Sequence, residues 1–110
     1  MGLFGFGRKK YEKNVERDNE FLKDYSVKVN GLLVYVEDNA KIVKELNQLK
    51  EDFQYTVASP DAKAKGVEKK ITEEFKKLTE TLQQPNWAEE EVSLLIKNLR
   101  RYVVEVASMQ

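Results

Sequence analysis

Residues 15–57 read VERDNEFLKDYSVKVNGLLVYVEDNAKIVKELNQLKEDFQYTV. Apolar residues recur every seven positions in this stretch, in two series offset by three. The members of the two series are Val15, Leu22, Val29, Val36, Val43 and Val57, and Tyr25, Leu32, Leu46 and Phe53. Such a heptad seam is typical of helices that pack lengthwise against other helices. A flanking apolar column that includes Ile42 and Leu49 widens the seam, which favours a helix inside a bundle over a two-stranded coil.

The composition of the whole chain agrees with a helical protein. A chain of 110 residues is long enough for one modest core, and 35% of its residues are charged while 41% are hydrophobic. The formal net charge is zero, so the chain lacks the overall basic field of a typical DNA-binding domain. Cysteine and histidine are absent. Their absence excludes disulfides, thiol nucleophiles, the usual zinc ligands and the commonest general base.

The first ten residues form a separate segment, which we expect to be flexible because three of its first seven residues are glycine. Its apolar residues precede a triple cation, and together the six are Leu3, Phe4, Phe6, Arg8, Lys9 and Lys10. Aromatic rings beside basic residues can insert weakly at a lipid surface with anionic headgroups. The sequence therefore leaves two interpretations open, a disordered start or a membrane contact at the inner face of the membrane. The remaining residues, 11–110, are predicted to form a single helical bundle domain.

The heptad pattern predicts one long helix from about residue 11 to about residue 58. Its weak point is Asn30-Gly31, because Asn-Gly between alternating apolar residues is also a strong β-hairpin signal. The heptad phase continues from Val29 to Leu32, however, and a lone two-stranded hairpin would be marginal. We therefore favour the helix, with a break near residues 25–31 and the hairpin as alternatives.

Two further helices are predicted to follow. Ser59 is a suitable N-cap before Pro60, which predicts a second helix over 60–83. Asn86 with Glu89 resembles a capping box and predicts a third helix after Pro85. The expected fold is all-α, an antiparallel bundle of three helices with a long first helix. The alternative is a four-helix bundle, if the first helix breaks near Asn30-Gly31.

A long first helix would leave part of its seam uncovered, and exposed apolar patches of that length are uncommon on monomers. The residues concerned are Tyr25, Val29, Leu32, Val36 and Asn39, which we predict to contact another protein or a second copy of the chain. The polar seam residues Asp18, Asn39 and Lys50 either fix the register of helix pairing or reach water. Trp87 either plugs the end of the bundle or anchors a partner.

The sequence contains no catalytic, metal-binding or nucleotide-binding motif. No other motif in it indicates a known family. We therefore expect a non-enzymatic cytoplasmic protein without a cofactor or small-molecule substrate, acting as an adaptor, regulator or self-assembling scaffold. The alternative is a small nucleic-acid-binding or phage-type regulatory protein that uses the lysines of the second predicted helix with Arg100 and Arg101. That alternative is disfavoured, because the lysines alternate with glutamates that can pair with them.

Overall fold

The computed structural model of the chain describes residues 20–57, 59 and 61–109. Within these residues an α-helix spans 20–32, which we call the first helix, and a short 3-10 helix, η1, follows at Leu33–Tyr35. Three more α-helices come next, α2 (Ala40–Tyr55), α3 (Ala62–Leu82) and α4 (Glu89–Ser108). None of the described residues lies in a β-strand. The predicted all-α class is therefore confirmed.

The first helix passes through Asn30-Gly31 without a break and ends at residue 32. The predicted single helix from residue 11 to residue 58 is wrong, because the chain turns back at residues 33–39. The alternative break near Asn30-Gly31 was placed too early in the chain, and the strand hairpin does not form. The described residues thus contain four α-helices instead of the predicted three, in agreement with the count of the four-helix alternative.

Asn39 closes the turn that separates the first helix from α2. Its backbone N–H donates to the carbonyl of Val36 at 2.8 Å, and the N–H of Val36 donates to the carbonyl of Leu33 at 3.2 Å. The Asn39 side-chain oxygen then accepts the N–H of Ile42 at 3.0 Å, which satisfies one of the free donors at the start of α2. Asn39 therefore caps a helix, a role that neither interpretation of the polar seam residues had foreseen.

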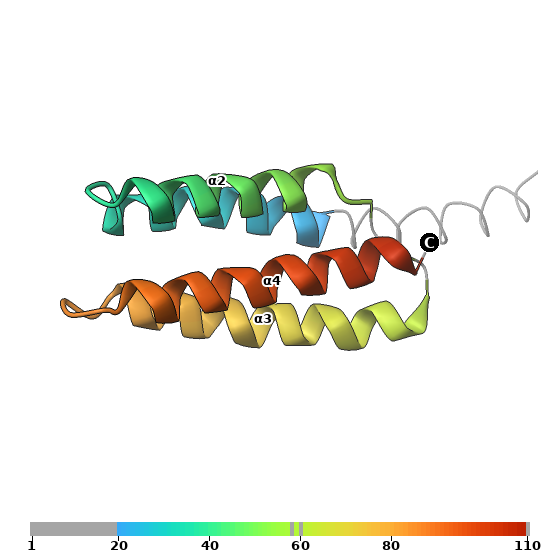
Figure 1. Cartoon of the computed structure of the whole chain (residues 1–110). Coiled ribbons are helices and arrows are strands. Elements are labelled where there is room, and N and C mark those ends of the chain that lie inside the picture. The colour runs from blue at the N-terminus through green and yellow to red at the C-terminus, as the bar shows by residue number, and fades with distance from the viewer. Residues whose placement is uncertain (1–19, 58, 60, 110) are drawn as a thin grey trace, which may run out of the picture.

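The four helices form two antiparallel hairpins stacked in two layers (Figure 1). The first helix and α2 make one layer, and α3 and α4 make the other, with the first helix over α3 and α2 over α4. Figure 1 also shows that the helices facing each other across the two layers run in the same direction. The predicted antiparallel packing thus holds inside each hairpin, whereas the packing between hairpins is parallel.

Side-chain pairs between α2 and α4 show the register of this parallel packing. The Ser93 hydroxyl donates to the Glu45 carboxylate at 2.9 Å, and Arg100 Nε donates to the Asp52 carboxylate at 2.6 Å. Both pairs join residues that are 48 positions apart in the sequence. A constant separation along two helices means that they run side by side in one direction, because in an antiparallel pair the separation would change with each turn.

The core lies between the two layers and takes residues from all four helices. Tyr25 of the first helix lies where three helices meet, with its ring centroid 5.5 Å from that of Phe53 in α2 and 4.9 Å from that of Phe75 in α3. The largest fully buried side chains are Phe53, Leu22, Ile42, Leu46, Leu49, Ile71, Leu78, Ile96, Leu99, Val29, Val36 and Val92. Burial of these apolar side chains is the main source of stability for a bundle of this size.

The two breaks predicted downstream of α2 are present, with different capping residues. Asp61 caps α3 by accepting the N–H of Lys63 at 2.9 Å, whereas Ser59 donates to the carbonyl of Met109 at 3.2 Å and so ties the connection to the end of α4. Ala88 occupies the N-cap position of α4 and makes no side-chain cap, so the predicted Asn86 cap is wrong. The chain reverses direction between α3 and α4 (Figure 1).

Candidate functional site

Four of the five residues predicted to form an uncovered seam are buried inside the chain's own bundle. Tyr25, Val29, Leu32 and Val36 belong to the hydrophobic core, and Asn39 caps α2. The seam was expected to be uncovered because the first helix was expected to be too long for its partners. Since that helix ends at residue 32 and α2 folds back beside it, this reason for expecting a partner is absent.

Trp87 lies in the connection between α3 and α4. Its side chain is half-buried and packs against the hydrophobic core from the end of the bundle. Beside it is a shallow hollow of about 330 Å³ that Trp87 lines together with Pro85, Asn86 and Glu91. This position fits the plug that the sequence suggested, and the contact of Trp87 with a partner stays a prediction.

The predicted membrane contact, formed by Leu3, Phe4, Phe6, Arg8, Lys9 and Lys10, lies outside the described residues. Among the residues that the structure describes, no helix is both long and apolar enough to cross a bilayer. The same residues contain no cluster of three or more acidic side chains placed to hold a metal ion.

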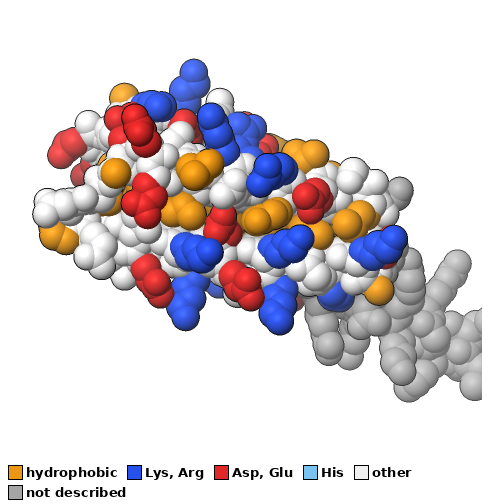
Figure 2. Space-filling model, turned by 60° about the horizontal axis from the view of Figure 1, so that its bottom comes forward, with side chains coloured by type: hydrophobic (Ala, Val, Ile, Leu, Met, Phe, Trp, Pro, Cys, Tyr) orange, Lys and Arg blue, Asp and Glu red, His pale blue; other side chains and the backbone are white. Residues whose placement is uncertain are grey.

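The basic residues of the nucleic-acid alternative are interleaved with acidic ones. Figure 2 shows Lys and Arg side chains alternating with Asp and Glu side chains over the face formed by α3 and α4. Lys77 lies 3.7 Å from the carboxylate of Glu74. Arg100 is held by Asp52 at 2.6 Å and by the Gln48 side chain at 3.2 Å. The hydrogen bond to Asp52 raises the pKa of Arg100 above its ordinary value, although partial burial works in the opposite direction.

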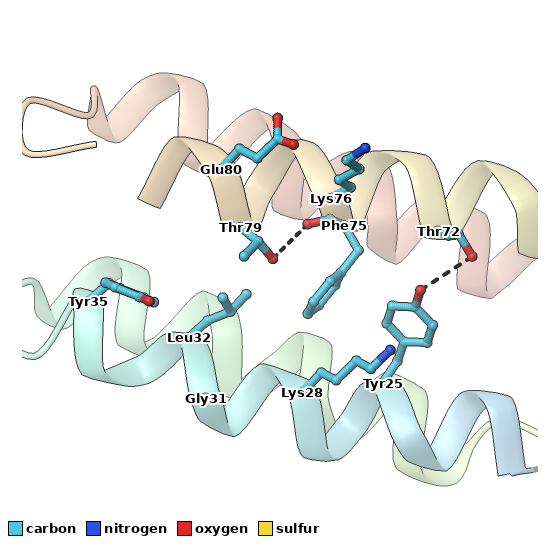
Figure 3. A pocket seen from close by; sticks show the side chains of 10 residues that line it. All are labelled: Tyr25, Lys28, Gly31, Leu32, Tyr35, Thr72, Phe75, Lys76, Thr79 and Glu80. Atoms are coloured by element: carbon cyan, nitrogen blue, oxygen red, sulfur yellow. Dashed lines mark hydrogen bonds between the residues drawn. The ribbon is translucent and has the colours of Figure 1, made fainter. Parts of the chain in front are cut away.

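A groove of about 650 Å³ lies between the first helix and α3 (Figure 3). We call it the α3 groove. Its wall on the first helix and η1 consists of Tyr25, Lys28, Gly31, Leu32 and Tyr35, and its wall on α3 consists of Thr72, Phe75, Lys76, Thr79 and Glu80. Sequence reasoning did not find this site, because the site depends on which helices become neighbours.

The polar groups on the floor of the α3 groove already have partners. The Tyr25 hydroxyl donates to Thr72 Oγ1 at 3.3 Å, and the Thr72 hydroxyl donates to the carbonyl of Glu68 at 3.1 Å. The Thr79 hydroxyl donates to the carbonyl of Phe75 at 3.0 Å (Figure 3). The floor therefore offers a ligand mainly the aromatic rings, methyl groups and backbone of these residues, which suits an apolar ligand surface better than a polar small molecule.

Charged groups lie at the rim of the groove. The Lys28 ammonium lies 4.5 Å from the centroid of the Tyr25 ring, a cation–π distance. Lys76 and Glu80 stand on the opposite wall, exposed to solvent (Figure 3). Tyr35 is 41% exposed at the far end. The rim thus carries two ammonium groups and one carboxylate around an apolar floor.

Gly31 is the least expected residue of the groove. Glycine inside a helix lowers stability by roughly 0.5–1 kcal/mol relative to alanine. Gly31 has no positive φ angle, and a Cβ atom built on it would meet no heavy atom within 4 Å beyond its chain neighbours and the backbone of its own helix. The fold therefore gives no reason for glycine at this position. Val27 and Val34, one helical turn to either side of it, are 66% and 62% exposed.

Comparisons of the chain with protein-family models, with curated proteins and with solved structures find no match.

Proposed function

We propose that this chain is a non-enzymatic binding protein that holds a helix of another protein in the α3 groove. The observation that carries the proposal is the combination of an apolar floor, in which the hydroxyl groups are already paired, with a helical glycine that the fold itself does not require. A groove between two neighbouring helices is a common place for an amphipathic helix to bind.

Gly31 supports the proposal because it affects how close the backbone of a bound helix can come to the first helix. A missing side chain lets another backbone approach the first helix more closely than any other residue would allow. Val27 and Val34, one helical turn to either side of Gly31, are exposed apolar residues outside the lining of the groove. The α3 groove is thus the surface through which we propose that the chain acts as the adaptor or regulator expected from the sequence.

The test is photo-crosslinking in the cells that produce the protein. A benzophenone amino acid replaces Tyr35, which is 41% exposed in the groove, or Tyr55, which is 75% exposed at the end of α2 and serves as the control. The proposal expects a discrete protein adduct from position 35 and none of the same mass from position 55. Equal labelling from both positions, or no adduct from position 35, would rule the groove out as the binding surface.

Docking at an anionic membrane surface remains a second proposal, carried by the apolar and basic residues of the opening segment. Co-sedimentation with anionic and neutral vesicles tests it, using the full chain and a chain that starts at Tyr11. Binding of the full chain to anionic vesicles only is the expected result. If both chains bind equally, the opening segment is not the contact.

Nucleic-acid binding has less support, because Arg100 is engaged by Asp52 and the lysines of α3 stand among carboxylates. A protein that neutralises phosphates would lose affinity steeply with added salt. Such a loss, measured with labelled DNA or RNA and abolished by reversing the charge of Arg101, would favour this function over the proposed one.

A further inference from the structure

We propose that the helix bound in the α3 groove is amphipathic and acidic, with an apolar stripe facing the floor and carboxylates facing Lys28 and Lys76. This inference rests on the proposed function and names the chemistry of the partner.

The length of the groove limits the partner's binding segment. The wall on the first helix and η1 runs from Tyr25 to Tyr35, which at about 1.5 Å per residue spans roughly 15 Å. A helix of about three turns covers that distance. Its contacts would come from apolar residues spaced three and four apart, the spacing that places side chains on one helical face.

The floor determines which face of the partner enters. Tyr25, Leu32 and Phe75 are almost fully buried beneath it, and the hydroxyls of Thr72 and Thr79 already donate hydrogen bonds. A polar face of the partner would lose its hydration there without gaining hydrogen-bond partners. The stripe that enters the groove is therefore apolar.

The rim determines the charge of the partner's flanks. Lys28 stands on one wall and Lys76 on the other, and no carboxylate of the described residues forms an ion pair with either of them within 4.0 Å. Glu80 is the single acidic residue lining the groove. Carboxylates on both flanks of the bound helix would meet a cation on each side, whereas a basic helix would meet two like charges.

The experiment is a fluorescence-anisotropy titration of the full chain with two labelled synthetic helices of about 14 residues, roughly four turns. Both peptides carry leucines at i, i+3, i+4 and i+7. One has glutamates on the flanks and the other has lysines at the same positions. At low salt the glutamate peptide is expected to bind about tenfold more tightly, because two rim pairs change from repulsion to attraction.

Charge reversal in the protein provides the matched control. The double variant Lys28→Glu with Lys76→Glu is expected to reverse the preference, so that the lysine peptide binds more tightly. The double variant Lys69→Glu with Lys97→Glu changes the net charge equally at two exposed lysines outside the groove, and it is expected to keep the preference for the glutamate peptide. Circular dichroism confirms that both variants fold.

Substitution of glycine checks the position of binding. Gly31→Leu fills open space in the groove and is expected to weaken the binding of the glutamate peptide at least about tenfold. Gly66→Leu makes the same change at an equally open helical glycine on α3 that does not line the groove, and it is expected to leave the affinity unchanged.

Several results would overturn the inference. Equal affinities for the two peptides, or a preference that survives reversal of Lys28 and Lys76, would exclude an acidic partner. Dimers of the full chain that Gly31→Leu abolishes would identify the occupant as a second copy. If neither peptide binds but Tyr35 still crosslinks to a protein, the acidic chemistry fails while the proposed function stands. If Tyr35 also gives no adduct, the proposed function fails as well.

Discussion

The hydroxyl of Tyr25 donates a hydrogen bond to Thr72 Oγ1 across the boundary between the two hairpins, at 3.3 Å. The Tyr25 ring contacts Phe53 of α2 and Phe75 of α3, so one side chain joins three helices. The same ring also forms part of the floor of the α3 groove. The residue that holds the hairpins together is therefore one that a bound helix would touch.

Because Tyr25 contributes both a hydrogen bond and a packed ring, two substitutions at this position are expected to differ in their effect on stability. Tyr25→Phe removes a long, partly buried hydrogen bond and is expected to lower the free energy of unfolding by about 0.5 kcal/mol. Tyr25→Ala also removes the ring from the core and is expected to cost about 3–5 kcal/mol. Urea unfolding followed by circular dichroism measures both values. Similar losses for the two variants would mean that the ring contributes little to the packing of the three helices.

The cap at Asn39 predicts a contrast between two asparagines. Asn39→Ala removes the side-chain oxygen that accepts the Ile42 N–H and is expected to lower the free energy of unfolding by about 1 kcal/mol. Asn30 is exposed within the first helix, so Asn30→Ala is expected to be neutral or slightly stabilising. Thermal unfolding of the two variants measures the difference. If both behave alike, Asn39 does not determine where α2 begins.

The two open glycines predict gains in stability. Gly31→Ala and Gly66→Ala each add a methyl group that meets no heavy atom within 4 Å beyond its chain neighbours and the backbone of its own helix. Each is expected to raise the free energy of unfolding by roughly 0.5–1 kcal/mol, because alanine loses less backbone entropy on entering a helix. A loss of stability on Gly31→Ala, measured by denaturant unfolding, would show that the fold itself requires this glycine.

The pairing of Arg100 with Asp52 predicts a difference between two adjacent arginines. Arg100→Ala is expected to lower the free energy of unfolding by about 1 kcal/mol, a value kept small because the Arg100 side chain is 42% exposed and water screens the pair. Arg101, which is exposed and donates to Asn98 at 3.3 Å, is the control, and Arg101→Ala is expected to change little.

The raised pKa of Arg100 determines how the difference in free energy of unfolding between wild type and Arg100→Ala depends on pH. A base with a raised pKa stabilises the fold at every pH below its ordinary pKa and loses that contribution only at higher pH. Titration of the guanidinium is therefore expected to add no slope to the difference between wild type and Arg100→Ala from about pH 6 to pH 9. A steep change in that range would require another titrating group in the contact.

The heptad pattern predicted the buried face of the first helix but not the length of that helix. Leu22, Tyr25, Val29 and Leu32 were expected on one face, and all four are buried. In α2 the seam residues Leu46 and Phe53 are buried together with Ile42 and Leu49 of the flanking column, whereas the pattern had also placed Val43 and Lys50 in the seam. Both of the latter residues are half-buried. The buried stripe of α2 thus lies toward the flanking column, and the charge of Lys50 within an apolar series was the signal of this difference.

The turn itself was hidden by residues that also suit a helix. Leu33, Val34, Tyr35 and Val36 continue the apolar pattern past the end of the first helix, so only Asn39 carried local information about a new start. Asn39 fell on a seam position and was interpreted as a pairing residue. A capping asparagine and a buried one share the same sequence signal, and the backbone around them decides between the two.

The α3 groove could not be predicted because its two walls are far apart in the sequence. Helical periodicity indicates which face of a helix is buried, but it does not indicate which other helix covers that face. Tyr25 and Thr72, for example, become neighbours only because the hairpins stack in parallel. Gly31 drew attention as a turn residue, and its position in the groove emerged only from the packing of the first helix on α3.

The most direct test of the proposed binding site is nuclear magnetic resonance of the labelled full chain, titrated with the glutamate-flanked peptide. We expect that the backbone resonances that move most belong to residues 25–35 of the first helix and η1 and to residues 72–80 of α3. Resonances of the α2 and α4 surfaces should stay in place. Shifts centred on α2 and α4, or spread evenly over the bundle, would contradict a binding site in the α3 groove.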